Sequence, residues 1–361
     1  MRILILSYQG FIAGSTFSIV YLAKGLAERG HEIYVGCKKN EMLYDLLQDS
    51  NVNVVNVPYK SKVDWESIRI VKDLVKNKKI DIINAQASND RYVSMLVKKL
   101  FYADLKVVHT RRQRPNSSGG YLHGKLYSWG TDKIVAVSKG VKNEAMKRMG
   151  IAEDHLEVIH NGTPSEKYQQ VLNDKAYDLK DKYNIKKNDW VIGCVSRHKK
   201  QEQLINALKF IKSISFKVIF VGIEKEEIEL NDTQYPEHHE FIFTGRIPPD
   251  EALRYYKVFD IHVLPSSTEG LSQSLLEAMF LKVPVIATDA MGNPDLIIHN
   301  QTGFLFQDGN VKELAAYINK LFHNDNIYNS MVKEAKKRVE DHFSIPRVVD
   351  EYERFFQRLI K

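Results

Sequence analysis

A pair of glutamates, Glu269 and Glu277, lies in the part of the sequence with the clearest chemical content. This stretch, residues 266–279 (SSTEGLSQSLLEAM), follows a predicted strand, and Gly270 allows a sharp turn into a helix. A helix N-terminus suits a phosphate, and carboxylates accept hydrogen bonds from hydroxyl groups. The pattern predicts a phosphate site with a sugar on one side and a ribose on the other. In the alternative interpretation, Glu269 is only a charge at a helix N-terminus and Glu277 only an exposed side chain.

A basic turn at residues 196–200 (SRHKK) is the second candidate site. It directly follows the predicted strand VIGCV. Cations at the carboxyl end of a strand, opposite a helix N-terminus, can complete a diphosphate site. An exposed basic turn without a ligand is the alternative.

Three arginines follow His109, which ends the predicted strand KVVHT with Thr110. The guanidinium group binds phosphate and carboxylate through a planar fork, so Arg111, Arg112 and Arg114 are predicted to bind an anion. In the alternative interpretation these arginines pair with local acids and hold their loop, and His109 is a structural histidine.

Other reaction classes lack their motifs in this sequence. Gly10 and Gly14 lie in a strand-to-helix loop, but their spacing does not match GxGxxG, which disfavours a nicotinamide dinucleotide. The histidines and cysteines show no metal-ligand spacing, and no GxSxG elbow is present. The two cysteines, Cys37 and Cys194, exclude a disulfide framework.

Strand and helix signals alternate along almost the whole chain, which predicts parallel sheets covered by helices on both faces. The alternation pauses in a polar, charged stretch at 165–188. We therefore expect an α/β fold with two doubly wound domains, residues 1–168 and 169–343, each with a cleft at the carboxyl ends of its strands. An amphipathic helix at 344–361 is expected to pack back on the first domain.

Length and composition agree with this organisation. A chain of 361 residues suits two domains. The net charge of +7, from 52 Lys and Arg against 45 Asp and Glu, is compatible with several kinds of anionic partner. No apolar run approaches the roughly 18 residues that a transmembrane helix needs, and the N-terminus lacks the features of a signal peptide. We therefore expect a cytoplasmic protein.

Taken together, these motifs resemble glycosyltransferase family 4 (glycosyl transferases group 1), a family of retaining GT-B enzymes. Glu269 and Glu277 form its E-x7-E pattern, and the resemblance covers nearly the whole chain in the right order. It implies two facing Rossmann-like domains with the active site in the interdomain cleft. The first domain would bind the acceptor and the second the nucleotide-sugar donor. The segments that carry the resemblance are LAKGLAERGHEIYV, IVAVSKGVKNEAMKRMGI with VIHNG, VIGCVSRHKKQEQLINAL, VFDIHVLPSSTEGLSQSLLEAM and VPVIATDAMGNPDLIIHNQTGFLF.

The resemblance also implies roles for individual residues. Glu269 would hold hydroxyl groups of the donor sugar and Glu277 the ribose. Arg197 and a following lysine would neutralise the departing diphosphate. The gap between arginine and lysine is shorter here than is usual in the family, so Lys199 and Lys200 compete, and the alignment of KQEQLI with the following helix favours Lys200. The other implied donor contacts are the N–H groups of Gly270, Leu271 and Ser272, the Gly14 loop closing over phosphate and sugar, and His109 on the donor sugar.

The expected activity is transfer of a sugar from a nucleotide-diphosphate sugar, with UDP or GDP as nucleotide, to a hydroxyl of a glycan or lipid-linked acceptor. Synthesis of cell-surface polysaccharide, lipopolysaccharide or glycolipid would fit, without a metal or other cofactor and without nucleic acid. The three arginines predict an anionic acceptor, and Lys98, Lys99 and Lys106 predict peripheral contact with anionic lipid at the inner face of the plasma membrane. The alternatives are a nucleotide-sugar 2-epimerase of the same fold and a non-catalytic sugar-binding protein.

Overall fold

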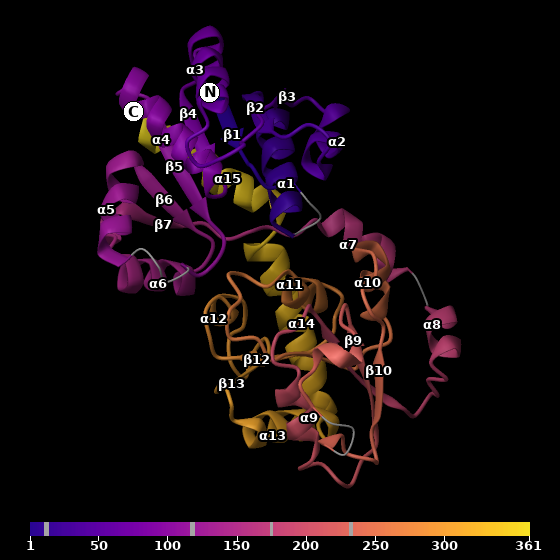
Figure 1. Cartoon of the computed structure of the whole chain (residues 1–361). Helices are drawn as coiled ribbons and strands as arrows, with labels where there is room; N and C mark the ends of the chain where they lie inside the picture. The colour runs from indigo at the N-terminus through magenta and orange to yellow at the C-terminus, as the bar shows by residue number, and fades with distance from the viewer. Residues whose placement is uncertain (11–13, 116–119, 174–175, 231–233) are drawn as a thin grey trace. The chain divides into compact units, whose positions relative to one another are not determined.

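The computed structural model describes residues 1–10, 14–115, 120–173, 176–230 and 234–361, which form two compact units (Figure 1). The first unit comprises Met1–Gly162 together with Ile345–Lys361, and the second comprises Thr163–Ser344. Each unit is built on one parallel sheet with helices on both faces. Both units are therefore Rossmann-like, as the alternation of strand and helix signals predicts.

The sheet of the first unit has seven parallel strands in the order β3-β2-β1-β4-β5-β6-β7. The order reverses between β1 and β4, so the loops that follow these two strands diverge and leave a crevice at their carboxyl ends. The strands of this sheet are β1 (Arg2–Leu6), β2 (Glu32–Cys37), β3 (Asn53–Asn56), β4 (Ile82–Ala85), β5 (Lys106–Arg111), β6 (Lys133–Ala136) and β7 (Leu156–Val158).

The continuous apolar run of β1 is explained by burial on both faces of the sheet. Ile3 and Ile5 pack into the core on one face, whereas Leu4 and Leu6 pack into the core on the other, because successive side chains of a strand alternate. The covering helices of the first unit are α1 (Gly14–Glu28), α2 (Met42–Gln48), α3 (Trp65–Lys78), α4 (Asn89–Phe101), α5 (Gly120–Gly130), α6 (Lys139–Met149) and α15 (Ile345–Ile360).

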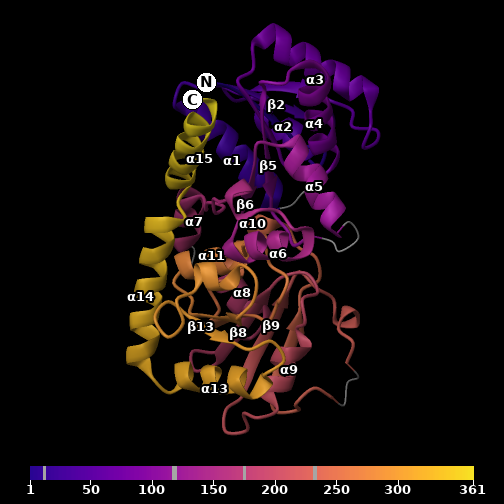
Figure 2. The same ribbon diagram turned by 90° about the vertical axis from the view of Figure 1, so that its left-hand side faces the viewer.

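Helix α15 belongs to the first unit although it ends the chain, and it lies alongside α1 (Figure 2). Its apolar face is buried in the core shared with α1. The two helices approach closely at Gly25, where a Cβ atom would lie 2.5 Å from Cγ2 of Val349. The amphipathic pattern at the C-terminus is thus explained by burial of the apolar face of α15 against α1, a helix far away in the sequence.

The sheet of the second unit has six parallel strands in the order β10-β9-β8-β11-β12-β13. Its order reverses between β8 and β11, which creates a second crevice of the same kind. The strands are β8 (Trp190–Val195), β9 (Phe216–Val221), β10 (Glu240–Phe243), β11 (Ile261–Leu264), β12 (Val285–Thr288) and β13 (Phe304–Phe306). The helices are α7 (Ser165–Leu172), α8 (Tyr177–Lys182), α9 (Glu202–Leu208), α10 (Pro249–Tyr255), α11 (Gln273–Phe280), α12 (Asn293–Leu296), α13 (Val311–Phe322) and α14 (Asp325–His342).

Candidate functional site

The basic turn and Glu269 meet at the reversal point of the second sheet. Residues 196–200 follow β8, and residues 265–272 connect β11 to α11. Since β8 and β11 are paired neighbours, both loops leave the same edge of the sheet. The structure therefore brings together two of the sites that the sequence singled out.

The two adjacent lysines point to different carboxylates. Lys199 Nζ lies 3.0 Å from Glu269 Oε1, with 24% and 21% of the two side chains exposed. Lys200 has a positive φ of 65°, and its Nζ lies 2.6 Å from Asp308 Oδ2. Gln203 also holds Asp308, through a 2.9 Å hydrogen bond from Nε2. The structure thus places Lys199 at Glu269 and Lys200 at the loop after β13, whereas the sequence alignment favoured Lys200.

Arg197 is exposed on the same turn. The turn is held by the buried Gln201, whose Nε2 donates to the Arg197 carbonyl oxygen at 2.9 Å and to Ser196 Oγ at 3.0 Å. Among the residues that the structure describes, none forms a hydrogen bond or ion pair with the Arg197 guanidinium. Its charge is therefore available to a ligand.

The loop that leads into α11 presents three N–H groups. Ser272 caps the helix, and its Oγ accepts a hydrogen bond from Leu275 N at 3.3 Å. Within the described ranges, no hydrogen bond occupies the N–H groups of Gly270, Leu271 or Ser272. These groups, at the positive end of an eight-residue helix, suit a phosphate.

The segment after β12 holds this loop in place. A Cβ atom on Gly292 would lie 1.9 Å from the Gly270 carbonyl oxygen, and Gly292 N donates to the Glu269 carbonyl oxygen at 3.1 Å. The fully buried Asn293 donates from Nδ2 to the carbonyl oxygens of Ser266, at 3.2 Å, and Thr288, at 3.0 Å. No role for Gly292 or Asn293 follows from the motifs described above, although the triplet Gly-Asn-Pro at the start of a helix is a signal for a tightly packed turn.

Glu277 lies within α11 and has a buried partner that the sequence did not reveal. Tyr256 donates from its hydroxyl to Glu277 Oε2 at 3.1 Å and to the Ser274 carbonyl oxygen at 3.1 Å. Burial and the neighbouring Glu277 carboxylate raise the pKa of Tyr256 well above its usual value, so Tyr256 remains a donor. This contact sets the orientation of the Glu277 carboxylate.

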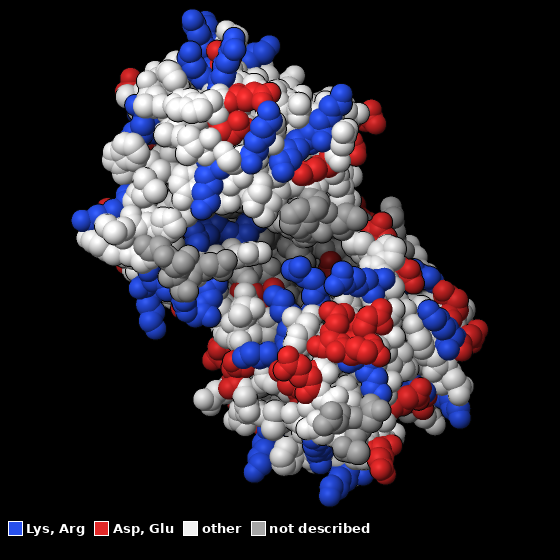
Figure 3. Space-filling model, in the orientation of Figure 1, with Lys and Arg blue, Asp and Glu red and all other residues white. Residues whose placement is uncertain are grey.

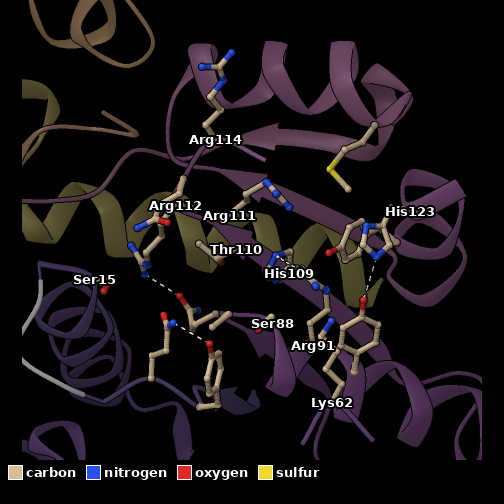
Figure 4. A pocket seen from close by; sticks show the side chains of 18 of the residues that line it. Ser15, Lys62, Ser88, Arg91, His109, Thr110, Arg111, Arg112, Arg114 and His123 are labelled. Atoms are coloured by element: carbon tan, nitrogen blue, oxygen red, sulfur yellow. Dashed lines mark hydrogen bonds between the residues drawn. The ribbon is translucent and has the colours of Figure 1, made fainter. Parts of the chain in front are cut away.

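A cavity of about 420 Å³ lies at the reversal point of the first sheet, at the carboxyl ends of β1, β4 and β5 (Figure 4). It lies within the first unit, and Figure 3 shows basic side chains gathered in a hollow there. None of the lining residues that the structure describes is an aspartate or glutamate. The six lining cations are Lys62, Arg91, Arg111, Arg112, Arg114 and Arg148.

His109 lines this cavity and is buried, with 3% of the residue exposed. Its Nδ1 lies 3.1 Å from the Ala85 carbonyl oxygen, which can only accept, so Nδ1 carries the proton. Nε2 therefore accepts from Arg91 Nη1, which lies 3.1 Å away. Burial, with the positive charge of Arg91, lowers the pKa of His109 well below its usual value, so the ring is neutral.

The three predicted arginines have different surroundings. Arg112 donates to two neutral amides, Gln86 Oε1 at 2.8 Å and Asn161 Oδ1. Arg114 Nε pairs with Glu144 Oε2 at 2.7 Å. Arg111 lies 6.0 Å from the ring centroid of Tyr127. In the described part of the chain only Arg114 pairs with an acid, so local ion pairing does not account for all three.

The lysines expected to attract lipid also have different surroundings. Lys98 is buried, and its Nζ donates to Asp132 Oδ2 and to the Leu105 carbonyl oxygen, both at 2.7 Å. The expectation that Lys98 meets a membrane is therefore wrong, because its charge is used inside the protein. Lys99, by contrast, lies 4.7 Å from the ring centroid of Trp129.

Two predicted loops lie partly outside the described residues. Gly14 is the exposed first residue of α1, but residues 11–13 of its loop are not described. The arginine segment, which we define as residues 109–120, is likewise described only in part, because residues 116–119 lie outside the described ranges. Closure of the Gly14 loop over a ligand stays a prediction.

Over the ranges that the structure describes, no group of three or more His, Cys, Asp and Glu side chains is arranged to hold a metal ion. None of the helices in these ranges combines the length and the apolarity that crossing a membrane requires.

Two family models match consecutive parts of the chain. The model "Glycosyltransferase Family 4" matches residues 12–167, and "Glycosyl transferases group 1" matches residues 177–338. Together they cover most of both units. The chain belongs to glycosyltransferase family 4. The family resemblance seen in the sequence is thereby confirmed.

Curated relatives share about a quarter of their residues with this chain. CapM, the capsular polysaccharide biosynthesis glycosyltransferase of Staphylococcus aureus, is 27% identical over 67% of the chain and 65% of CapM. The chain thus spans just under two thirds of that relative. The UDP-Gal:alpha-D-GlcNAc-diphosphoundecaprenol alpha-1,3-galactosyltransferase of Escherichia coli is 26% identical over 88% of the chain and 87% of its own length.

Solved structures show the fold. A glycosyltransferase from Rickettsia africae matches 100% of this chain and 98% of its own, with a TM-score of 0.85 and 21% identity. Alr3699/HepE of Anabaena, solved in complex with UDP, matches 99% of this chain and 100% of its own, with a TM-score of 0.82 and 19% identity. The fold of this family 4 protein is GT-B, as expected.

Proposed function

We propose that this protein is a retaining glycosyltransferase that moves a sugar from a nucleotide-diphosphate sugar to a hydroxyl group. The observation that carries the proposal is the juxtaposition, at the reversal point of the second sheet, of Glu269, two cations and a row of open N–H groups. A diphosphate needs the cations and N–H groups, and a sugar needs the carboxylate. The Anabaena relative of the same fold, solved with UDP and with UDP-glucose, supports UDP as the nucleotide, with GDP as the alternative.

We assign the donor roles from these positions in the second unit. Glu269 holds hydroxyl groups of the donor sugar and Glu277, oriented by Tyr256, holds the ribose. Arg197 and Lys199 neutralise the departing diphosphate, and we propose Lys199 rather than Lys200 because Lys199 already lies at Glu269. Lys199 would exchange its carboxylate partner for phosphate when the donor binds.

The proposed reaction keeps the anomeric configuration by a front-face displacement. The bond from the anomeric carbon to the diphosphate breaks while the acceptor oxygen bonds to the same face. The acceptor proton passes to a leaving phosphate oxygen, and the cations of the second unit stabilise the charge that develops. The chemistry as proposed requires no metal, and His109, neutral and buried in the cavity of the first unit, would not take the acceptor proton.

The acceptor would be an anionic glycan or a lipid-linked glycan, bound in the cavity of the first unit. Its six cations and lack of lining carboxylates support an anion there. The acceptor named for the E. coli relative, a diphosphoundecaprenol-linked sugar, and the capsular polysaccharide named for CapM support synthesis of cell-surface polysaccharide or glycolipid. The first unit would then serve the acceptor and the second the donor.

We further propose that the protein works in the cytoplasm at the inner face of the plasma membrane. Helices α4 and α5 contact each other and expose a group of large apolar side chains. Lys99, over the Trp129 ring, adds positive charge to this surface, a combination typical of binding to the interface of an anionic bilayer. The exposed residues are Leu100, Phe101, Tyr121, Leu122, Leu126 and Trp129.

The membrane proposal is tested with Trp129→Ser, which should lower the fraction of protein that sediments with anionic phospholipid vesicles. Trp65→Ser is the matched control, because Trp65 is 65% exposed on α3 of the same unit and Trp129 is 55% exposed on α5. Equal binding of both variants and the wild type would argue against this surface.

The activity itself is tested by incubating the protein with UDP-, GDP- and ADP-sugars and following the products by NMR, which also reports the anomeric configuration. A transferase hydrolyses or transfers from one donor with retention. Interconversion of two nucleotide sugars would show a 2-epimerase, and no turnover with binding intact would show a sugar-binding protein.

A further inference from the structure

The cavity of the first unit carries positive charge that the protein does not balance. Of its six lining cations, Arg114 and Arg148 share one carboxylate, that of Glu144. The nearby Asp90 is buried and accepts from the N–H groups of Gln86, at 2.6 Å, and Ala87, at 2.8 Å. Most of the charge in the cavity is therefore left for a ligand.

Four side chains that line the cavity also have a buried N–H group that donates a hydrogen bond to no described residue. Three are the Nε groups of Arg91, Arg111 and Arg112, and the fourth is Nε2 of Gln86. Buried donors of this kind are rare in proteins because leaving them unbonded costs stability. These four atoms are themselves screened from solvent, so what the cavity offers to an anion is its unbalanced positive charge.

Arg91 is the centre of this arrangement, although it lies in α4 and outside the arginine segment. It is 5% exposed, its Nη1 is held by His109, and its guanidinium carbon lies 3.8 Å from the ring centroid of Tyr127. The neutral His109 and the Tyr127 ring hold this cation without neutralising it. Figure 4 shows Arg91 and Arg111 on either side of His109.

The number of cations distinguishes between kinds of anion. A carboxylate brings one negative charge and two oxygens, whereas a phosphate monoester brings about two charges and three free oxygens at neutral pH. Paired arginine forks match phosphoryl oxygens well. The cavity, at about 420 Å³, is also much larger than a phosphoryl group, which leaves room for an attached sugar.

We propose that this cavity recognises a phosphoryl group, a phosphate or diphosphate carried by the acceptor, and that Arg91 and Arg111 are its direct ligands. Arg112 and Arg114 already bond Gln86 and Glu144 and position the cavity wall. That the ligand is the acceptor rests on the proposed function, but the binding of a phosphoryl group does not.

The test is isothermal titration of inorganic diphosphate into the full chain carrying Arg197→Ala and Lys199→Ala, which disables the other phosphate site. When Arg91→Gln and Arg111→Gln are introduced together into this variant, its affinity for diphosphate should fall about tenfold or more. Arg69→Gln is the surface control, because it removes one arginine charge from an exposed position of the same unit and should leave binding unchanged, and it is compared with each of the single cavity substitutions. Loss of the same size in the control, or none in the cavity variant, would overturn the proposal.

Two further measurements keep the proposal falsifiable. Arg91→Lys keeps the charge but not the fork, so its binding should be intermediate, and Arg111→Gln alone provides a second readout if variants at Arg91 do not fold. Glucuronate is titrated beside glucose 1-phosphate as a carboxylate probe. Equal affinity for these two sugars would show a general anion site and overturn the phosphoryl assignment.

The source of the phosphoryl group is distinguished by two arms. Binding of soluble glucose 1-phosphate that depends on Arg91 would indicate a soluble phosphorylated acceptor. Binding only to phosphatidylcholine vesicles that contain a long-chain polyprenyl phosphate, again dependent on Arg91, would indicate a lipid-linked one. Either result supports the proposal. If binding of a probe depends on Arg91 but the protein transfers no sugar, the proposed function is rejected and the phosphoryl site is not.

Discussion

The two sheets reverse their strand order in the same way, yet the crevices at their reversal points carry charge differently. In the second unit each lysine of the turn after β8 has a carboxylate partner, Glu269 or Asp308, and these pairs are partly exposed. In the first unit the cations are gathered around a neutral, buried His109, and no carboxylate is among the described residues that line the cavity. A site with paired charges is nearly neutral when empty, whereas a site with unpaired cations favours an anion at all times.

The difference suggests how one fold can serve two ligands. A nucleotide sugar presents both hydroxyl groups and a diphosphate, so a carboxylate and a lysine that bond each other at rest can each take a different part of it. A phosphorylated acceptor presents its charge in one place, which unpaired arginines recognise. The predictions below test this contrast.

The largest effect is expected at the lysine pair. Lys199→Ala should lower kcat by about 10²-fold or more, because it removes a positioned charge from the departing diphosphate. Lys200→Ala should have a small effect, because its ammonium bonds Asp308 instead. Steady-state kinetics with the identified donor checks both variants, and the reverse order would restore the role that the sequence alignment gave to Lys200.

A smaller loss is expected at Glu277, the carboxylate that we propose holds the ribose. Glu277→Ala should weaken binding of the bare nucleoside diphosphate by about 1–3 kcal/mol, the scale of a hydrogen bond to a charged group. Tyr256→Phe keeps the carboxylate but removes the hydroxyl that orients it, so its loss should be smaller. Calorimetric titration measures both, and unchanged affinity in Glu277→Ala would exclude Glu277 from the ribose site.

The buried acid beside the cavity predicts a pH effect on stability. Burial raises the pKa of Asp90 to about 6, above its unfolded value, so folding favours the protonated form. The stability that this group contributes is therefore fully present below about pH 4 and is lost as the pH rises through about 6. Urea unfolding between pH 4 and pH 8 should show this loss in the wild type relative to Asp90→Asn, by about 1–3 kcal/mol. A constant difference between the two proteins would contradict the raised pKa.

The smallest effect is expected at Arg114, whose partly exposed ion pair with Glu144 marks the edge of the cavity. Arg114→Ala should lower the free energy of unfolding by less than about 1 kcal/mol, the usual range for such pairs. If the cavity ligand is held by Arg91 and Arg111, the KM for the acceptor should also change little. A loss in Arg114→Ala as large as that in Arg111→Gln would show that the whole arginine segment binds the acceptor.

Much of the fold follows from local sequence patterns. The run Ile3 to Leu6 is apolar throughout because both faces of β1 are buried, and this pattern of short apolar runs between helices is visible without a structure. The terminal amphipathic helix, expected from residue 344, begins at Ile345.

The location of both crevices was also determined by the sequence, because glycines, carboxylates and cations at strand ends are local features. Which of two neighbouring side chains points into a crevice was not determined by the sequence. Lys199 and Lys200 differ in where their side chains point, which depends on the positive φ of Lys200 and on Asp308, more than a hundred residues away. Such contacts between distant parts of the chain leave no periodic signal in the sequence.

The same reason explains why two basic residues of α4 have different surroundings. By charge alone Arg91 and Lys98 are equivalent members of one helix, yet the structure places Arg91 against His109 and pairs Lys98 with Asp132. The sequence determined that these residues are basic and lie in a helix beside a strand end. Only the tertiary structure decided which charge is neutralised inside the protein and which remains for a ligand, because neutralisation depends on partners that other strands and helices supply.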